Sequence, residues 1–309
     1  MKWTGVIPAV TTPFEPSLAV DHNLLFQHTS WMLKNGCTGL VMLGSLGEGA
    51  TLEHNEKVAI LETALRASEK TGTPVVAGIS SLSTAAAVRL AKEAEDLGCA
   101  GLMVLPPYIY STDWREMKAH IAAIMRATKL SCMLYNNPVA YKTDYIPEQV
   151  KELAQEFPNL HAIKESSTDV RRVTAIRAVL DDRLTICTGV DDAIVEAVAA
   201  GSSAWIAGLV NAFPAESVAL YELAMAGKHQ EAFELYRWFL PLLRLDTVPK
   251  FVQLIKWVQE QTGTGTARVR PPRLELVGAE LEEVKAVLAT AMANRPTIKS
   301  TPFPVLQQV

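Results

Sequence analysis

A lysine at the end of an apolar run is the residue of this sequence best suited to covalent chemistry. Residues 160–163, Leu-His-Ala-Ile, lead directly into Lys164, and the polar stretch Glu-Ser-Ser-Thr-Asp follows. Burial disfavours a charged ammonium group and lowers its pKa, so a free amine becomes available. A free amine in a pocket attacks carbonyl carbons and forms Schiff bases. The alternative is a structural lysine whose head reaches solvent or pairs with Glu165.

Two further motifs supply groups that Schiff-base chemistry needs. Tyr135 begins the YNNP motif at the end of another apolar run, where its hydroxyl could carry protons to and from the lysine. The alternative for Tyr135 is packing with a solvated hydroxyl. The turn at 44–47, Gly-Ser-Leu-Gly, precedes a predicted helix, and its backbone N–H groups could hold a carboxylate. An amine, a phenol and an anion-binding turn together indicate chemistry on a 2-oxo acid.

The elements that must position these groups alternate regularly along the chain. Continuous apolar runs rich in β-branched residues are typical of parallel strands buried on both faces, and amphipathic helical segments separate them. Eight such units predict a closed (β/α)₈ TIM barrel of the α/β class, with the polar groups at the carboxyl ends of the strands. An open doubly wound sheet is disfavoured because no Gly-x-Gly-x-x-Gly follows the first strand. The predicted strands are Gly5–Val10, Gly39–Leu43, Pro74–Ile79, Gly101–Leu105, Ser131–Tyr135, Leu160–Lys164, Leu184–Thr188 and Ser203–Leu209.

The strand pattern stops after residue 227, which predicts a barrel over 1–227 and a separate extension. Three further helices, an appended C-terminal helical layer over 228–293, are predicted at Glu231–Leu245, Val248–Gln261 and Glu280–Ala293. The tail, 294–309, is rich in proline and polar residues, and we expect it to be mobile or to form an arm.

Composition excludes several classes of function. The chain has 309 residues, of which 49% are hydrophobic and 20% charged, and its net charge is −4 with no basic block to follow a nucleic-acid backbone. No apolar stretch reaches the roughly 18 residues that a membrane span needs, and the start lacks a signal-peptide core. The four cysteines are widely spaced, which argues against disulfides and structural zinc and predicts a cytoplasmic protein.

Three motifs, in order, carry a resemblance to a known family. They are GSLGE at 44–48, YNNP at 135–138 and IKES at 163–166, and the segments GVIPAVTTPF and GVDDAI agree with them. The chain resembles the dihydrodipicolinate synthase / N-acetylneuraminate lyase family over nearly its whole length.

The resemblance implies a (β/α)₈ barrel with a C-terminal helical extension, usually assembled as a homotetramer, with no metal and no organic cofactor. Within it, Lys164 would form the Schiff base and Tyr135 would transfer protons. The backbone N–H groups of Ser45 and Leu46, with the Ser45 hydroxyl, would hold the substrate carboxylate. Two further residues, Gly189 and Ile206, would line the 2-oxo-acid pocket through backbone groups.

Departures from the family pattern bear on the substrate. In dihydrodipicolinate synthases a hydroxyl residue of the turn belongs to a proton relay, and here that position is Leu46. A relay tyrosine after the fourth strand aligns with Ile109, between Tyr108 and Tyr110. The arginine that binds the aldehyde substrate's carboxylate aligns with Ala140. The nearest cation there is Lys142, and neither residue reproduces a guanidinium fork.

These departures favour a compact substrate without a distal carboxylate. One family branch acts on 1-pyrroline-4-hydroxy-2-carboxylate, a cyclic imine that Lys164 could open by transimination, with loss of water and ammonia. The alternatives are a dihydrodipicolinate synthase and a 2-keto-3-deoxy sugar-acid aldolase or dehydratase. Two further possibilities are a catalytically idle barrel that binds 2-oxo acids and a phosphate-handling barrel, although no basic residue accompanies the glycines after the last two strands.

The remaining charged clusters have structural interpretations. We expect Asp191 and Asp192 to cap a helix rather than to bind a metal. The arginines of residues 267–273, ARVRPPR, are expected to make surface or subunit contacts.

Overall fold

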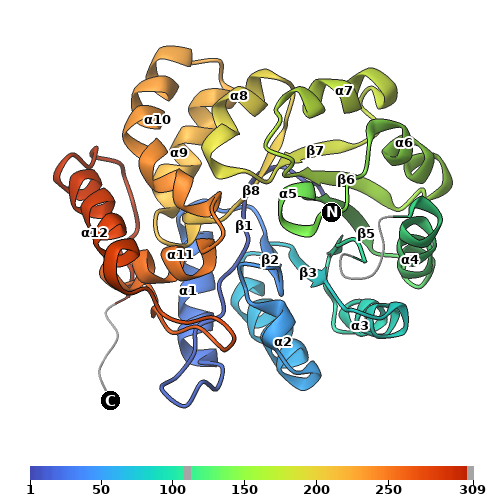
Figure 1. Ribbon diagram of the computed structural model, residues 1–309, viewed down its shortest axis with the longest axis horizontal. Helices are drawn as coiled ribbons and strands as arrows, with labels where there is room; N and C mark the ends of the chain where they lie inside the picture. Colours follow the sequence, from blue (N-terminus) through green and yellow to red (C-terminus); the bar gives the residue numbers. More distant parts are fainter. Residues whose placement is uncertain (108–112, 305–309) are drawn as a thin grey trace.

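A parallel barrel forms the body of the protein. The computed structural model covers the chain, and it describes residues 1–107 and 113–304. The strand order is β1-β8-β7-β6-β5-β4-β3-β2, and a parallel bridge between Ala9 and Val41 brings the two edge strands together. The predicted (β/α)₈ barrel is therefore confirmed (Figure 1). The strands are β1 (Gly5–Pro8), β2 (Leu40–Met42), β3 (Val75–Ile79), β4 (Gly101–Val104), β5 (Ser131–Asn136), β6 (Leu160–Glu165), β7 (Thr185–Thr188) and β8 (Ala204–Ala207).

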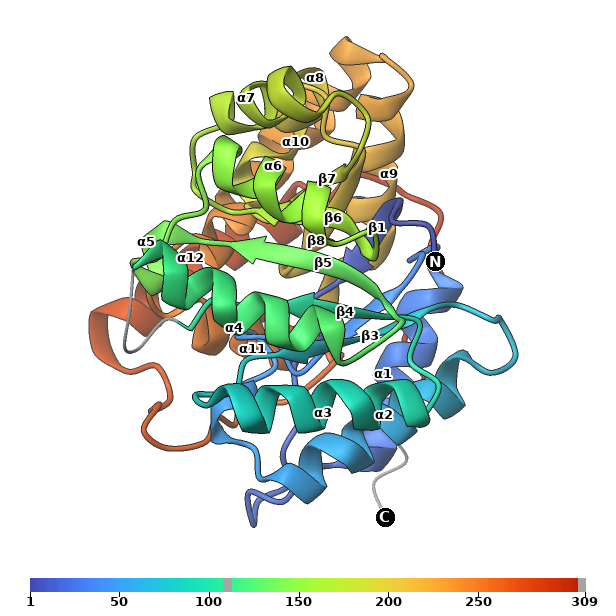
Figure 2. The same ribbon diagram turned by 90° about the vertical axis from the view of Figure 1, so that its right-hand side faces the viewer.

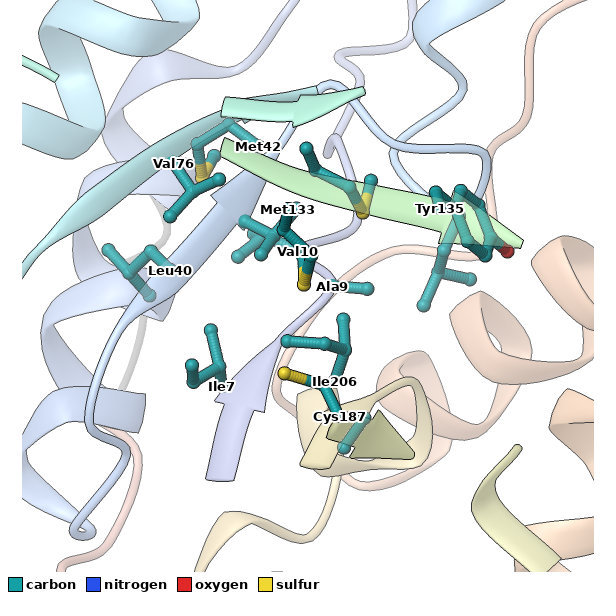
Figure 3. Packing of buried hydrophobic residues seen from close by; sticks show 14 of the residues in the cluster. Ile7, Ala9, Val10, Leu40, Met42, Val76, Met133, Tyr135, Cys187 and Ile206 are labelled. Carbon is teal, nitrogen blue, oxygen red and sulfur yellow. The ribbon is translucent and has the colours of Figure 1, made fainter. Parts of the chain in front are cut away.

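Apolar side chains fill the interior of this barrel. Figure 3 shows Ile7, Leu40, Val76 and Met133 pointing toward one another, whereas Tyr135 lies at the tip of the β5 arrow. The aliphatic side chains give a packed core of the kind that barrels of this size have. Lys164 and Tyr135 lie beyond this core, near the carboxyl ends of β6 and β5.

Helices cover the outside of the barrel, within a few residues of the predicted segments. The short helix α5 (Pro138–Tyr141) is an addition that the periodicity did not predict, because four residues are too few to show a repeat. Its first turn is capped by the Asn137 side chain, which accepts a hydrogen bond from the Ala140 N–H at 2.9 Å. The others are α1 (His22–Lys34), α2 (His54–Ser68), α3 (Thr84–Asp96), α4 (Trp114–Arg126), α6 (Pro147–Glu156), α7 (Arg171–Leu180), α8 (Ile194–Ala199) and α9 (Pro214–Met225).

The C-terminal extension consists of the three predicted helices. They are α10 (His229–Leu243), α11 (Phe251–Gln261) and α12 (Gly278–Ala293), with the single turn η4 (Arg244–Asp246) after α10. In Figure 2 the β5 arrow points toward α5, and α11 and α12 lie toward that end of the molecule, away from the N-terminus. The extension is thus placed to contribute residues to the mouth of the barrel.

A buried carboxylate ties this extension to the barrel. Glu48 is fully buried, and its oxygens accept hydrogen bonds from Lys256 Nζ at 2.8 Å and from the Arg270 N–H at 3.0 Å. Arg273 lies 3.7 Å from the same carboxylate, and the Arg270 guanidinium pairs with Glu56. Within the chain these two arginines pair with carboxylates on the barrel, and the expectation that residues 267–273 make surface or subunit contacts stays a prediction.

The last described residues lie along α1 as an arm. The Trp31 indole N–H donates a hydrogen bond to the Thr301 carbonyl at 2.7 Å, and the Phe303 ring packs edge-on against Trp31. No helix in the described part of the chain is long and apolar enough to cross a membrane.

Replacing Glu48 by glutamine leaves the Lys256 ammonium group, whose side chain is 1% exposed, without its carboxylate. We expect the free energy of unfolding to fall by about 3–5 kcal/mol, the usual loss when one partner of a buried ion pair is removed. Urea denaturation followed by circular dichroism measures this change. The matched control is Lys285→Met, which breaks the solvent-exposed pair with Glu282 and should change stability by less than about 1 kcal/mol. Equal losses for the two variants would contradict the prediction.

Candidate active site

Lys164 lies near the carboxyl end of β6, between two neighbouring strands that hold it in register. Its backbone is paired with Tyr135 on β5 and with Cys187 on β7. The side chain is 7% exposed, and Nζ lies 4.2 Å from the centre of the Tyr135 ring. The amine therefore points into the open end of the barrel against an aromatic face.

The amine of Lys164 has no ion-pair partner in the described part of the chain. Burial lowers its pKa, and the negative charge of Asp246 acts in the opposite direction. Glu165 is engaged elsewhere, because its oxygens accept hydrogen bonds from Asn136 Nδ2 at 3.0 Å and from the Ser167 N–H at 2.6 Å. The alternative of a structural lysine paired with Glu165 is therefore wrong.

The Tyr135 hydroxyl sits in a small network of polar groups. It accepts a hydrogen bond from Asn137 Nδ2 at 3.1 Å, and it also interacts with the side chains of Ser166 and Tyr141. Burial raises the pKa of Tyr135 to about 12, so the phenol is neutral near pH 7. A neutral phenol with several hydrogen-bond partners can donate and accept a proton in turn.

The glycine-rich turn presents unused donors to the same space. Within the described residues, the backbone N–H groups of Ser45 and Leu46 have no intramolecular acceptor. The Ser45 hydroxyl is hydrogen-bonded to the Tyr141 hydroxyl. Adjacent free N–H groups in a tight turn form a concave site that suits a carboxylate.

Glycine is required at position 189 because the lysine side chain packs on it. A Cβ there would overlap Lys164 Cε and the Ser166 hydroxyl. This glycine and Ile206 on β8 both line the cavity. All six residues predicted for the site, namely Lys164, Tyr135, Ser45, Leu46, Gly189 and Ile206, border one cavity of about 460 Å³.

Of the positions that depart from the family pattern, some border the cavity and others do not. Ala140 borders the cavity, whereas Lys142 is exposed and its Nζ donates to the Val139 carbonyl at 3.0 Å. Lys142 therefore does not replace the missing arginine. The positions of Tyr108, Ile109 and Tyr110 lie outside the described residues.

Three residues of the cavity were missed in the sequence. Tyr141 ends helix α5, Asp246 comes from η4, and Arg273 comes from the segment after α11. Tyr141 follows the YNNP motif closely enough to have been suspected, but no motif marks the other two. Only the packing of the extension onto the barrel brings Asp246 and Arg273 to Lys164.

Asp246 is a half-buried carboxyl group that packs against Gly208, where a Cβ would overlap it. Its pKa is raised well above the usual range, chiefly by burial and secondly by the nearby charge of Asp191. The positive charge of Lys164 opposes this shift. A carboxyl group with a raised pKa keeps its proton to higher pH than an ordinary aspartic acid, which suits a proton donor.

Asp191 does not cap the helix that follows it, so that expectation is wrong. The fully buried carboxylate accepts hydrogen bonds from Trp205 Nε1 at 2.9 Å and from the Leu209 N–H at 2.7 Å. Burial raises its pKa to about 6. Asp191 thus joins the end of β7 to the turn after β8. No group of three or more potential ligands among the described residues is arranged to hold a metal ion.

The model of the dihydrodipicolinate synthetase family matches residues 2–291. This chain belongs to that family. A family relative from Desulforamulus reducens, named 4-hydroxy-tetrahydrodipicolinate synthase, is 30% identical over 296 residues, which cover 92% of this chain and 95% of the relative. A relative of the same name from Rhizobium meliloti is 30% identical over 270 residues, covering 87% of this chain and 92% of the relative.

Solved structures of the family agree with this fold. The 4-hydroxy-tetrahydrodipicolinate synthase of Methylacidiphilum fumariolicum SolV superposes with a TM-score of 0.90 at 28% identity, over 94% of this chain and 97% of that one. A chloride-inhibited dihydrodipicolinate synthase from Acinetobacter baumannii, solved with pyruvate, gives a TM-score of 0.89 at 26% identity, over 94% and 99% of the two chains. The protein is accordingly a lyase of the class I aldolase type, within a family that binds pyruvate and related 2-oxo acids.

The lowered pKa of Lys164 predicts the pH dependence of its reaction with pyruvate, trapped by borohydride. Only the free amine attacks, so the rate should rise with pH and level off below the ordinary lysine value of 10.5. In Asp246→Asn the negative charge that raises the pKa of Lys164 is lost, and the profile should shift to lower pH. The matched control, Asp182→Asn, alters a fully exposed carboxylate and should leave the profile unchanged. A midpoint at 10.5 or above in the wild type would refute this prediction.

Proposed function

We propose that Lys164 forms a Schiff base with a small hydroxylated substrate and that the reaction ends in dehydration and deamination. The preferred substrate is 1-pyrroline-4-hydroxy-2-carboxylate. The observation that carries this proposal is the Asp246 carboxyl group, which borders the same cavity as Lys164 and has a raised pKa. Two sequence departures support it. Leu46 stands where a synthase has a proton-relay hydroxyl, and Ala140 stands where a synthase has the arginine that binds the second substrate's carboxylate.

The first step exchanges one imine for another. The turn at Ser45 and Leu46 holds the substrate carboxylate through its free N–H groups. Lys164 Nζ attacks C2, and the bond between C2 and the ring nitrogen breaks. The opened substrate carries a primary amine on C5 and an iminium group at C2. Tyr135 supplies and removes the protons that this exchange requires.

The second step removes the hydroxyl group. A proton leaves C3, the electron pair forms the C3–C4 double bond, and the C4–O bond breaks. Asp246 gives its proton to the departing hydroxide, which leaves as water. An acid is needed here because hydroxide is a poor leaving group, and positioned proton donors of this kind contribute about 10²–10⁴ in rate.

Hydrolysis completes the reaction. One proton leaves C5 and one leaves its nitrogen, C3 and C4 each gain a proton, and the amine at C5 becomes an imine. Water then hydrolyses both C=N bonds, which releases ammonia from C5 and frees Lys164. One water leaves and two are consumed, so the substrate and one water give ammonia and 2-oxoglutarate semialdehyde.

Arg273 favours a second candidate function. Arg273 borders the cavity, and within the described residues its side chain makes no hydrogen bond; it forms an ion pair with Glu48 at 3.7 Å. A cation in that place suits a substrate with a distal carboxylate, such as a 2-keto-3-deoxy sugar acid or aspartate semialdehyde. The names of the relatives from Desulforamulus reducens and Rhizobium meliloti point the same way.

A substrate screen separates these candidates. We expect 1-pyrroline-4-hydroxy-2-carboxylate to yield ammonia and the semialdehyde, at a rate at least about 100-fold above that for pyruvate with aspartate semialdehyde. Borohydride trapping and mass spectrometry should place the adduct on Lys164, and Lys164→Ala should give none. Turnover of pyruvate with aspartate semialdehyde near the enzyme median of about 10 s⁻¹ would replace the proposal by the synthase. An idle barrel would give no adduct with any 2-oxo acid.

The role of Asp246 has its own test. Asp246→Asn removes the proton donor but keeps the shape of the side chain, so we expect the dehydration rate to fall about 100-fold or more. The yield of the trapped Lys164 adduct should stay close to that of the wild type. A loss of adduct together with turnover would assign Asp246 to the shaping of the site instead.

The homotetramer expected from the family stays a prediction, which sedimentation would check.

A further inference from the structure

The hydroxyl groups of Tyr135, Tyr141 and Ser45 follow one another in space, and all three residues border the cavity. The Tyr141 hydroxyl is hydrogen-bonded to the Ser45 hydroxyl, and it also interacts with the Tyr135 hydroxyl, where it opposes the rise in pKa that burial causes. The Tyr135 ring lies against the Lys164 amine, with its centre 4.2 Å from Nζ, and Ser45 belongs to the turn with free N–H groups. The series therefore runs from the ring beside Lys164 to the expected position of the substrate carboxylate.

Local structure fixes the middle hydroxyl in place. Asn137 joins the two tyrosines, because its Oδ1 caps helix α5 while its Nδ2 donates to the Tyr135 hydroxyl. The rings of Tyr135 and Tyr141 pack edge to face with their centres 5.7 Å apart. The short helix α5 thus carries Tyr141 back over the end of β5.

We propose that Tyr141 is a positioning residue that relays protons between Tyr135 and Ser45. This inference rests on the proposed Schiff-base function of Lys164. The neighbouring turn position holds Leu46, which has no hydroxyl, so Tyr141 supplies the link from another element of the fold. The pyruvate carbinolamine on Lys164 loses its hydroxyl as water with a proton from Tyr135. Tyr141 gives its proton to Tyr135 and receives one from Ser45, which is reprotonated by solvent.

The relay matters because burial raises the pKa of Tyr135 and so disfavours its ionised form. A buried phenolate is disfavoured, and a proton given up by Tyr135 must be replaced at once if that charge is to be avoided. Passing the proton along the series returns each hydroxyl to its neutral form. Losing the middle hydroxyl should therefore slow proton transfer without weakening the binding of pyruvate.

Tyr141→Phe tests the relay, because it removes the hydroxyl and keeps the ring against Tyr135. The measurement is the rate of Lys164–pyruvate adduct formation, followed by borohydride quenching at saturating pyruvate. We expect this rate to fall about 100-fold, the lower end of what proton transfer contributes. The pyruvate concentration for half-saturation should change less than about threefold. A structural role would alter that concentration or the melting temperature instead.

Tyr145→Phe is the matched control. Tyr145 is a nearby buried tyrosine whose hydroxyl has no hydrogen-bond partner in the described structure, and it does not border the cavity. Its removal should leave the rate of adduct formation unchanged. An undiminished rate in Tyr141→Phe, or an equal loss in both variants, would overturn the inference.

Ser45→Ala interrupts the same series at its other end and serves if Tyr141→Phe fails to fold. We expect a slower rate in Ser45→Ala, and in the double variant a rate no lower than that of the slower single variant, because residues that act as a unit are not additive. A multiplicative loss would contradict the relay. A wild-type protein that forms no adduct with pyruvate or with 1-pyrroline-4-hydroxy-2-carboxylate would refute the proposed function itself.

Discussion

The burial of one amine without a counter-ion is the constraint on which the site depends. An ammonium group in a low-dielectric interior either loses its proton or acquires a carboxylate partner. Lys164 has no such partner among the described residues, because Glu165 turns to Asn136 and Ser167 on the outside of the strand. Burial in the barrel therefore lowers the pKa of the Lys164 amine. The face of Tyr135 still gives some support to the cationic imine that follows attack.

Two carboxyl groups near this amine belong to different elements: Asp191 follows β7, and Asp246 lies in η4. Asp191 accepts hydrogen bonds from the Trp205 indole and from the Leu209 N–H, and it thereby links the end of β7 to β8 and the turn after it. Asp246, in contrast, reaches the cavity from η4, and no hydrogen bond holds it within the described structure. Asp191 thus has a structural task, whereas we propose that Asp246 acts on the substrate. Such a division is common where neighbouring acids must not titrate together.

Much of the fold could be predicted from the sequence because strands buried on both faces leave continuous apolar runs. Lys164 and Tyr135 could be located for the same reason, since each ends such a run. The contribution of Asp246 could not, because it depends on how η4 packs on Gly208, and no local pattern records that contact. Asp191 was misjudged because its partners lie on another strand. Helix α5 was not predicted because a single turn is too short to show a periodic pattern. The position of Tyr141, which ends this helix, was not predicted for the same reason.

The attachment of the extension through Glu48 has an evolutionary consequence. The same carboxylate that anchors Lys256 and Arg270 sits in the turn that presents Ser45 and Leu46. A segment docked in this way can diverge while the barrel stays intact, and each new version brings different groups to an unchanged lysine. Substrate preference can then drift through replacements in residues 228–309, the C-terminal part of the chain. Grafting that part between homologues is accordingly a direct route to redesigned selectivity.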